Sequence, residues 1–110
     1  MADVPDDVEL TMVTLRLEAT DEATAAKLLG VLAKYVVIAR GQEGCRNIDL
    51  VASVTHPWRY LLVQKWDSPD AQRAHFDSDA MVEMAESCRG LLARAPEIDL
   101  WDGISAHDLA

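Results

Sequence analysis

The chain has few of the residues that mark several common classes of protein. Only two of its 110 residues, Cys45 and Cys88, are cysteines, which is too few for a disulfide framework or a cysteine-rich zinc motif. We therefore expect both thiols to be reduced. No phosphate-binding loop, Rossmann glycine pattern or cluster of metal ligands is present in the sequence. No metal or cofactor is expected, which fits cofactor-free chemistry and equally fits a protein without catalytic chemistry.

Basic residues are also scarce. The chain has 10 basic and 19 acidic residues, a formal net charge of −9, and no basic run. It is a poor candidate for binding nucleic acid or an anionic membrane, and the charge mainly favours solubility. The longest apolar run, Tyr35–Ala39, is too short to cross a bilayer, and the first ten residues are acidic where a signal peptide would be basic. We expect a soluble, cytoplasmic protein.

Apolar periodicity predicts a strand followed by a helix. Residues 8–17 alternate and then become apolar on both sides, as in a strand that becomes buried. Thr20, followed by two acids, predicts a hydroxyl N-cap, and Gly41 predicts the stop. The β-branched pair at 36–37 predicts fraying from about residue 37. The stripe expected to be buried comprises Ala25, Leu28, Leu29, Leu32, Val36 and Ala39.

Residues 45–54 and 60–66 predict two strands, and Pro57 in the polar break between them predicts a hairpin. A turn centred on Pro57 would place Trp66 opposite Ile48. Side chains alternate between the faces of a strand, so one face of this hairpin is expected to carry a defined set. That set is Ile48, Leu50, Ala52, Val54, Tyr60, Leu62, Gln64 and Trp66.

The second helix is predicted in two pieces. Ser68-Pro69 combines an N-cap with a proline at the first helical position. Ser78, followed by an acid, predicts another cap, so the first piece should end at Phe76 and the second should run to about Arg94. The residues expected to be buried in the second piece are Met81, Met84, Ala85, Cys88 and Leu92, with Leu91 as a further candidate.

A last strand at 97–104 completes the order β-α-β-β-α-β. This order predicts an α+β, ferredoxin-like domain, in which two helices cover one face of an antiparallel sheet. We expect one domain over residues 1–110, with its core at about 8–104. The uncovered face also carries apolar residues, which predicts burial against a second subunit in a homodimer. These residues are Val51, Leu61 and Val63.

Several short motifs occur together in order and spacing. They are Glu43-Gly44-Cys45, Asp49-Leu50, Trp66 with Ser68, Ala74-His75 with Ser78, and Leu91-Leu92 followed by Pro96-Glu97. Over roughly residues 8–104 the chain resembles the antibiotic biosynthesis monooxygenase family. The resemblance implies ferredoxin-like subunits that pair into a dimeric α+β barrel. For some members it implies oxygenation of quinols or aromatic polyketides by O2 without metal, flavin or heme.

Two positions depart from branches of that family. Polyketide oxygenases resemble one another in an asparagine four residues before the tryptophan of the third strand, and Leu62 stands there. A heme-degrading branch typically has a tryptophan in place of His75 and a heme-ligating histidine ten residues later. Ala85 occupies that later position and cannot ligate iron, so heme degradation is not expected.

His75 is the candidate catalytic residue. A histidine titrates near neutral pH, so it can take a phenolic proton or hold the resulting oxyanion. The simpler alternative is a half-exposed helix histidine bonded to a neighbour. His56 and His107 lie in a predicted turn and in the tail, where we expect them to be solvated.

The substrate pocket is expected between the second helix and the sheet face that carries Trp66. An indole can wall an aromatic site, although a core anchor is an equally simple role for Trp66. Gln64 either lines the pocket or bonds a neighbouring element. Trp58 and Trp101 are expected in an interface or the core. The substrate-binding candidates are Trp66, Ile48, Leu62, Gln64, Phe76 and Met84.

Three functions remain open from the sequence. The first is a cofactor-independent monooxygenase that oxidises a quinol or a phenolic, polyketide-like aromatic with O2. The second is a non-catalytic small-molecule-binding or stress-related dimer on the same fold. The third is an isomerase or decarboxylase on a related dimeric barrel, which would also use a lone histidine.

Overall fold

The computed structural model describes residues 10–104. The expected α+β, ferredoxin-like architecture is confirmed, and the second helix is in two pieces as predicted. Expectations for residues 1–9 and 105–110, including the start of the first strand and His107, lie outside the described residues. The elements are β1 (Thr11–Glu18), α1 (Glu22–Arg40), β2 (Cys45–Ala52), β3 (Arg59–Trp66), α2 (Pro69–Phe76), α3 (Asp79–Ser87) and β4 (Glu97–Asp102).

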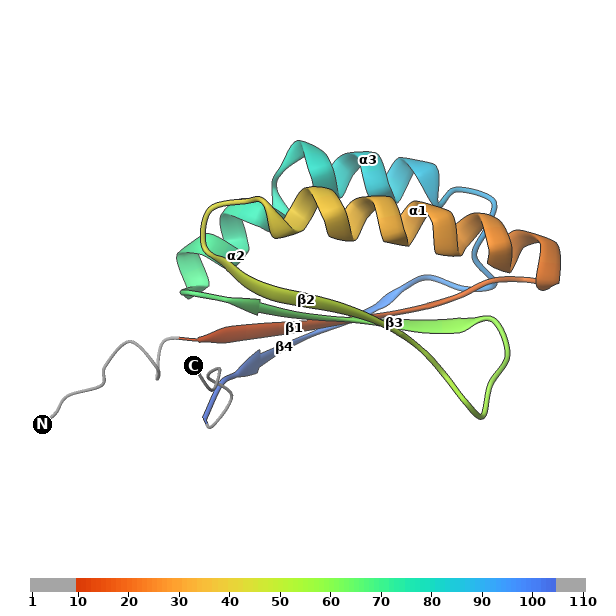
Figure 1. Ribbon diagram of the computed structural model, residues 1–110, viewed down its shortest axis with the longest axis horizontal. Coiled ribbons are helices and arrows are strands. Elements are labelled where there is room, and N and C mark those ends of the chain that lie inside the picture. The colour runs from red at the N-terminus through yellow and green to blue at the C-terminus, as the bar shows by residue number, and fades with distance from the viewer. Residues whose placement is uncertain (1–9, 105–110) are drawn as a thin grey trace, which may run out of the picture.

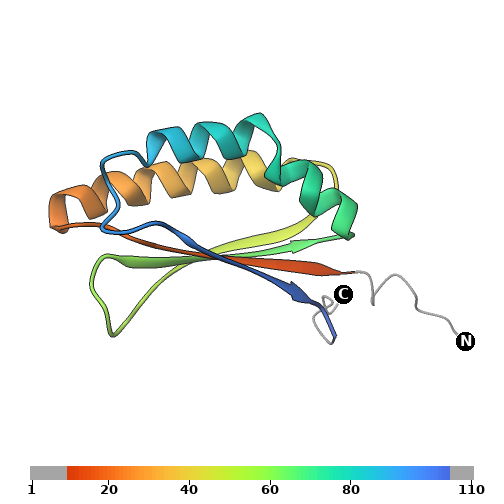
Figure 2. The ribbon, with the colours of Figure 1, turned by 180° about the vertical axis from the view of Figure 1, so that it is seen from behind.

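The helices and the sheet form two layers. The four antiparallel strands are ordered β2-β3-β1-β4, and α1, α2 and α3 all lie on one side of the sheet (Figure 1). The reverse view shows that no element of the described chain covers the other side (Figure 2). The core therefore lies between the helices and one sheet face, and it includes Leu15 of β1, Leu28 of α1 and Leu62 of β3.

The first helix begins one residue later than predicted and ends at the predicted stop, Gly41. Its N-cap is Asp21, because the Asp21 carboxylate accepts from the Thr24 backbone and the Thr24 hydroxyl reaches back to the cap. The predicted fraying is wrong: α1 stays helical to Arg40, whose guanidinium donates to the Ile48 carbonyl at 2.7 Å. The expected burial of Leu29 is also wrong, since its side chain is 43% exposed.

The hairpin faces follow the prediction, but the register differs by two residues. Ile48 pairs with Gln64 instead of Trp66, because the turn centres on residue 56; a bulge between Cys45 and Asn47 changes the register only at the start of β2, where Cys45 lies opposite Trp66. A shift of two residues leaves each side chain on its predicted face. Ile48, Gln64 and Trp66 are accordingly all buried on the helix side.

The break between α2 and α3 lies at the predicted cap, Ser78, but α3 is shorter than expected. It ends at Ser87 instead of near Arg94, since Cys88 caps it and Gly90 adopts a φ of +78° that no helix continues. The chain then returns to the sheet, where Leu92 bridges to Ala19. Contrary to expectation, Ala85 is exposed.

Candidate functional site

His75 is fixed in the core at the end of α2. Its side chain is only 5% exposed, and its ring stacks on the Trp66 indole with centroids 4.5 Å apart and planes 27° apart. The backbone is held as well, because the Ser78 hydroxyl donates to the His75 carbonyl at 2.6 Å. The residue is therefore a rigid, buried group and not a half-exposed helix histidine.

A chain of hydrogen bonds runs from Trp66 through His75. The Trp66 Nε1–H, which can only donate, binds Gln64 Oε1 at 2.9 Å, so the Gln64 amide nitrogen donates to Tyr35 Oη at 2.8 Å. Tyr35 in turn bonds to His75 Nε2 at 2.5 Å. His75 Nδ1 bonds to Gln42 Oε1. Because Gln42 Oε1 can only accept, the His75 proton lies on Nδ1, and Nε2 accepts from the Tyr35 hydroxyl.

Burial keeps both titratable groups of this network neutral. Desolvation lowers the pKa of His75 below its ordinary value of 6.5 and raises the pKa of Tyr35 to about 12. At neutral pH the site therefore holds a neutral imidazole with a basic nitrogen and a protonated phenol. Such a pair can transfer a proton, and neither group carries a charge before the reaction.

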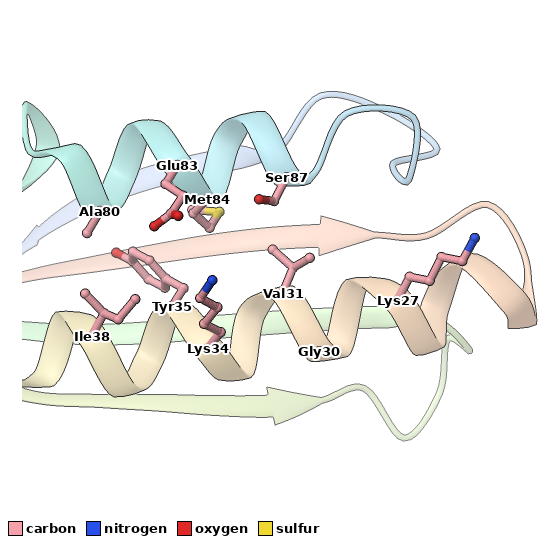
Figure 3. A pocket seen from close by; sticks show the side chains of 10 residues that line it. All are labelled: Lys27, Gly30, Val31, Lys34, Tyr35, Ile38, Ala80, Glu83, Met84 and Ser87. Carbon is pink, nitrogen blue, oxygen red and sulfur yellow. The ribbon is translucent and has the colours of Figure 1, made fainter.

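Within the described residues, two cavities are lined by members of this network, and a third is linked to it through Met81. An apolar cavity of about 600 Å³ lies between α3 and the β1–β4 side of the sheet, and residues lining it include Leu15, Met81 and Ile98. A second cavity of about 400 Å³ lies between α1 and α3, with Tyr35 in its wall (Figure 3). A polar cavity of about 630 Å³ borders His75 on its Gln42 side.

The structure brings together some of the predicted site residues and separates others. His75, Gln64 and Trp66 share the hydrogen-bonded and stacked network. Phe76 and Met84 line the apolar cavity. The other two candidates lie in the core beneath the helices and line none of the three cavities described above; they are Ile48 and Leu62, both fully buried. Their binding roles stay predictions.

Sequence reasoning missed Tyr35 and Gln42. Tyr35 lies seven residues after Leu28 and three after Leu32, so helical spacing places it on the buried stripe. A hydroxyl on that stripe needs a buried partner, which is the signal that was available. Gln42 lies in the loop after α1, where no periodicity indicates the direction of a side chain.

Neither a cluster of metal ligands nor a membrane-spanning helix is found in the described part of the chain. Between residues 10 and 104, no three or more histidine, cysteine, aspartate or glutamate side chains gather into a group able to hold a metal ion. The helices of that same part of the chain are all too short or too polar to span a bilayer.

Comparison with curated proteins finds no match, whereas solved structures match closely in fold. A Deinococcus radiodurans protein, provisionally assigned as an antibiotic biosynthesis monooxygenase, superposes with a TM-score of 0.81 at 18% identity, over 91% of this chain and 98% of that one. A Caulobacter crescentus protein with the same provisional assignment gives 0.78 at 22% identity, over 89% and 92%. SnoaB, a cofactor-independent oxygenase from Streptomyces nogalater, gives 0.74 at 18% identity, over 84% and 91%.

These superpositions show a shared fold. The family is shown by a match between the sequence and a family model. The family model described as antibiotic biosynthesis monooxygenase matches residues 11–87, from the first strand to the end of α3. That segment contains His75 and all of its hydrogen-bond partners. The chain belongs to the antibiotic biosynthesis monooxygenase family.

Proposed function

We propose that the protein is a cofactor-independent monooxygenase that oxidises a phenolic or quinol-type aromatic with O2. The observation that carries this proposal is a buried, neutral histidine in a hydrogen-bonded network that Met81 connects to an apolar cavity. Family membership supports the same chemistry, as does the fold shared with SnoaB. The proposal extends the predicted role of His75 as base or oxyanion partner.

The apolar cavity between α3 and the sheet is the proposed substrate site. Its volume of about 600 Å³ is in the range of small-molecule pockets, which are apolar with a few placed polar groups. Phe76 and Met84, two of the predicted substrate-binding residues, line it, which supports this choice. Arg89 and Arg94 also line this cavity, and a guanidinium there favours a substrate that becomes an anion.

The reaction begins when the phenol loses its proton to the network, with His75 as the final acceptor. The phenolate passes one electron to O2, and the resulting radical pair combines to a peroxide anion at the para carbon. The imidazolium returns its proton to give the hydroperoxide. The para C–H bond and the O–O bond then break together, and the released proton and hydroxide leave as water. A phenol with a free para C–H thus reacts with O2 to give a quinone and one water, and the substrate is the only reductant.

One observation favours a second candidate, a non-catalytic small-molecule-binding protein. Both ring nitrogens of His75 already have hydrogen-bond partners, as expected for a histidine whose role is to satisfy a polar core. In that case the apolar cavity would bind an aromatic ligand without turnover. Ligand binding without O2 consumption is the result that would separate this candidate from the oxygenase.

A homodimer formed through the uncovered sheet face remains part of the proposal. That face carries Val51, which is 46% exposed, and Trp101, which is 52% exposed. It also carries Leu61 and Val63, the alternating residues of β3 whose neighbours point toward the helices. An apolar surface of this kind on a small domain favours a subunit interface, and we keep the cytosol as the proposed compartment.

The first test measures O2 uptake with α-naphthol, a phenol with a free para position, and with a panel of quinols. The wild-type protein should accelerate uptake above the uncatalysed rate. His75→Ala should lower kcat/KM roughly 10²–10⁴-fold, since a positioned general base contributes about that much.

His56→Ala is the matched control, because His56 lies in the exposed β2–β3 turn, and its hydrogen bonds within residues 10–104 are to Thr55 and Ser53. It should keep the wild-type rate. Equal rates for the wild type, His75→Ala and His56→Ala would exclude His75 as the base.

A further inference from the structure

The basic nitrogen of His75 is not open to a substrate. An imidazole Nε2 that carries no proton has one lone pair, and the Tyr35 hydroxyl occupies it at 2.5 Å. The other nitrogen, Nδ1, bears the proton that bonds to Gln42. One face of the ring is stacked on Trp66. A substrate proton that ends on His75 must therefore pass through Tyr35, unless the whole network is rearranged.

Tyr35 Oη has the valence for such a transfer. A phenolic hydroxyl has one proton to donate and two lone pairs that accept. Its proton points to His75, and one lone pair accepts from the Gln64 amide at 2.8 Å. Among residues 10–104, no donor fills the second lone pair. The remaining contact of Oη is Met81 Sδ at 3.7 Å, and a thioether sulfur has no proton to donate.

Met81 and Met84 place Tyr35 next to the proposed substrate site. Met81 contacts Tyr35 Oη and also lines the apolar cavity between α3 and the sheet. Met84 lines that cavity and the cavity between α1 and α3, whose wall includes Tyr35 (Figure 3). Methionine is unbranched and adapts to its neighbours, so Met81 is the side chain that would move for a phenol in this cavity to approach Oη.

We infer that Tyr35 is a catalytic residue, the group that accepts the substrate's phenolic proton while passing its own to His75. This inference rests on the proposed oxidation of a phenol. The substrate O–H bond and the Tyr35 O–H bond break as a new Tyr35 O–H bond and a His75 Nε2–H bond form. The products are a substrate phenolate and an imidazolium, and no electron moves in this step.

An exchange of protons suits a buried tyrosine better than ionisation does. Tyr35 is neutral before and after the step, so the protein never has to hold a tyrosinate in its core. The elevated pKa of Tyr35, about 12, disfavours that anion. Gln64 donates to the phenolic oxygen of Tyr35 throughout and keeps it in place, and a hydrogen bond from the Trp66 indole fixes the Gln64 amide.

The test replaces Tyr35 with phenylalanine and follows O2 uptake with α-naphthol across pH. At neutral pH, Tyr35→Phe should lower kcat roughly 10²–10⁴-fold, the range for one proton-transfer group, while KM changes little. The defect should shrink as the pH rises through the pKa of the naphthol itself, because an ionised substrate needs no base. Tyr60→Phe is the control, since Tyr60 is the other tyrosine of the chain and lies outside the network.

A proton inventory on the wild-type protein covers the case in which Tyr35→Phe does not fold. Rates in mixtures of H2O and D2O should curve, as expected for two protons in flight, and a straight line would overturn the role of Tyr35. So would a Tyr35→Phe enzyme with the wild-type rate, or with a defect that is the same at every pH. A wild-type protein that consumes no O2 with any phenol would instead overturn the proposed oxidation, and this inference with it.

Discussion

At the scale of single residues, the site depends on which nitrogen of His75 carries a proton. Gln42 determines this, because its Oε1 can only accept and therefore places the proton on Nδ1. The Tyr35 hydroxyl then donates to Nε2. At the other end of the chain the Trp66 indole, which can only donate, orients the Gln64 amide toward Tyr35.

The pKa of His75 predicts how the stability of the protein depends on pH. Burial lowers that pKa in the folded state, whereas the unfolded chain has the ordinary value of 6.5. Below pH 6.5 the unfolded state binds the extra proton first, so stability is full above that pH and is lost as pH falls toward the folded pKa. Each tenfold difference in proton affinity corresponds to about 1.4 kcal/mol.

Chemical denaturation at a series of pH values measures this effect. His75→Gln cannot titrate but keeps a donor and an acceptor, so it is the matched variant. Carboxylates with lowered pKa values, such as Glu18 and Glu97, act alike in both proteins and cancel. The free-energy difference between the two proteins should narrow below pH 6.5; a constant difference would show that His75 titrates normally.

The sequence predicted three residues of the hydrogen-bonded network and missed two, and each outcome has a physical reason. Gln64 was recognisable because it is polar on an otherwise apolar face, Trp66 because an indole can wall an aromatic site, and His75 because histidine titrates near neutral pH. Tyr35 was missed because its ring fits an apolar helical stripe and its hydroxyl leaves no trace in the periodicity. Gln42 was missed because the direction of a loop side chain depends on the packing of α2 against the loop.

At the scale of elements, the site depends on close contact between α2 and the loop after α1. Gly44 in that loop has a φ of +86°, and a Cβ built on it would lie 2.5 Å from the Ala71 Cβ of α2. The Gly44 carbonyl also accepts from the Asp67 backbone at 2.8 Å, which ties the loop to the end of β3. This contact keeps Gln42, two residues earlier, opposite His75.

Two glycine substitutions of opposite sign test this contact. Gly44→Ala should destabilise the protein by at least about 1 kcal/mol, the cost of a left-handed conformation for a side chain with a Cβ, before the clash with Ala71 is counted. Gly30→Ala should stabilise it by about 0.5–1 kcal/mol, since Gly30 lies inside α1 and an added methyl group would meet nothing within 4 Å beyond the helix backbone. Thermal denaturation of both variants checks the signs, and a neutral Gly44→Ala would mean that the loop is not held close to α2.

Element boundaries show where the sequence was and was not sufficient. The break at Ser78 was predictable because a cap is a local property of a few residues. The end of α3 was misplaced because Pro96 is a stronger stop signal than Gly90, although Gly90 has the positive φ. The hairpin register was misplaced because it depends on which residue centres the turn, and the alternation of side chains does not reveal that residue.

At the scale of the whole molecule, the main open surface is the sheet face without helices (Figure 2). Its edge strand β4 is exposed along its whole length. The Trp101 indole on that strand donates to Thr14 Oγ1 at 2.9 Å. Two ion pairs, Arg16–Glu97 and Arg59–Glu18, cross the same face. Apolar and paired polar groups together fit the homodimer interface that we propose.

Val63→Lys tests that interface, because Val63 lies on an inner strand with Asp49 as its neighbour on β2. The variant should fold but sediment as a monomer, since an amine would be buried between two sheets. Val37→Lys is the control: Val37 is 72% exposed on α1, on the helix side of the molecule. Sedimentation velocity distinguishes the outcomes, and a Val63→Lys dimer as tight as the wild type would place the interface elsewhere.

The fate of oxygen during oxidation of α-naphthol by the wild-type protein tests the proposed monooxygenase activity most directly. With isotopically labelled O2 in ordinary water, the network beside the apolar cavity should yield para-naphthoquinone with one labelled oxygen atom, the other label leaving as water. Mass spectrometry of the quinone, extracted at early times, measures this. Unlabelled quinone, or no quinone beyond the protein-free control, would contradict the proposed monooxygenase chemistry.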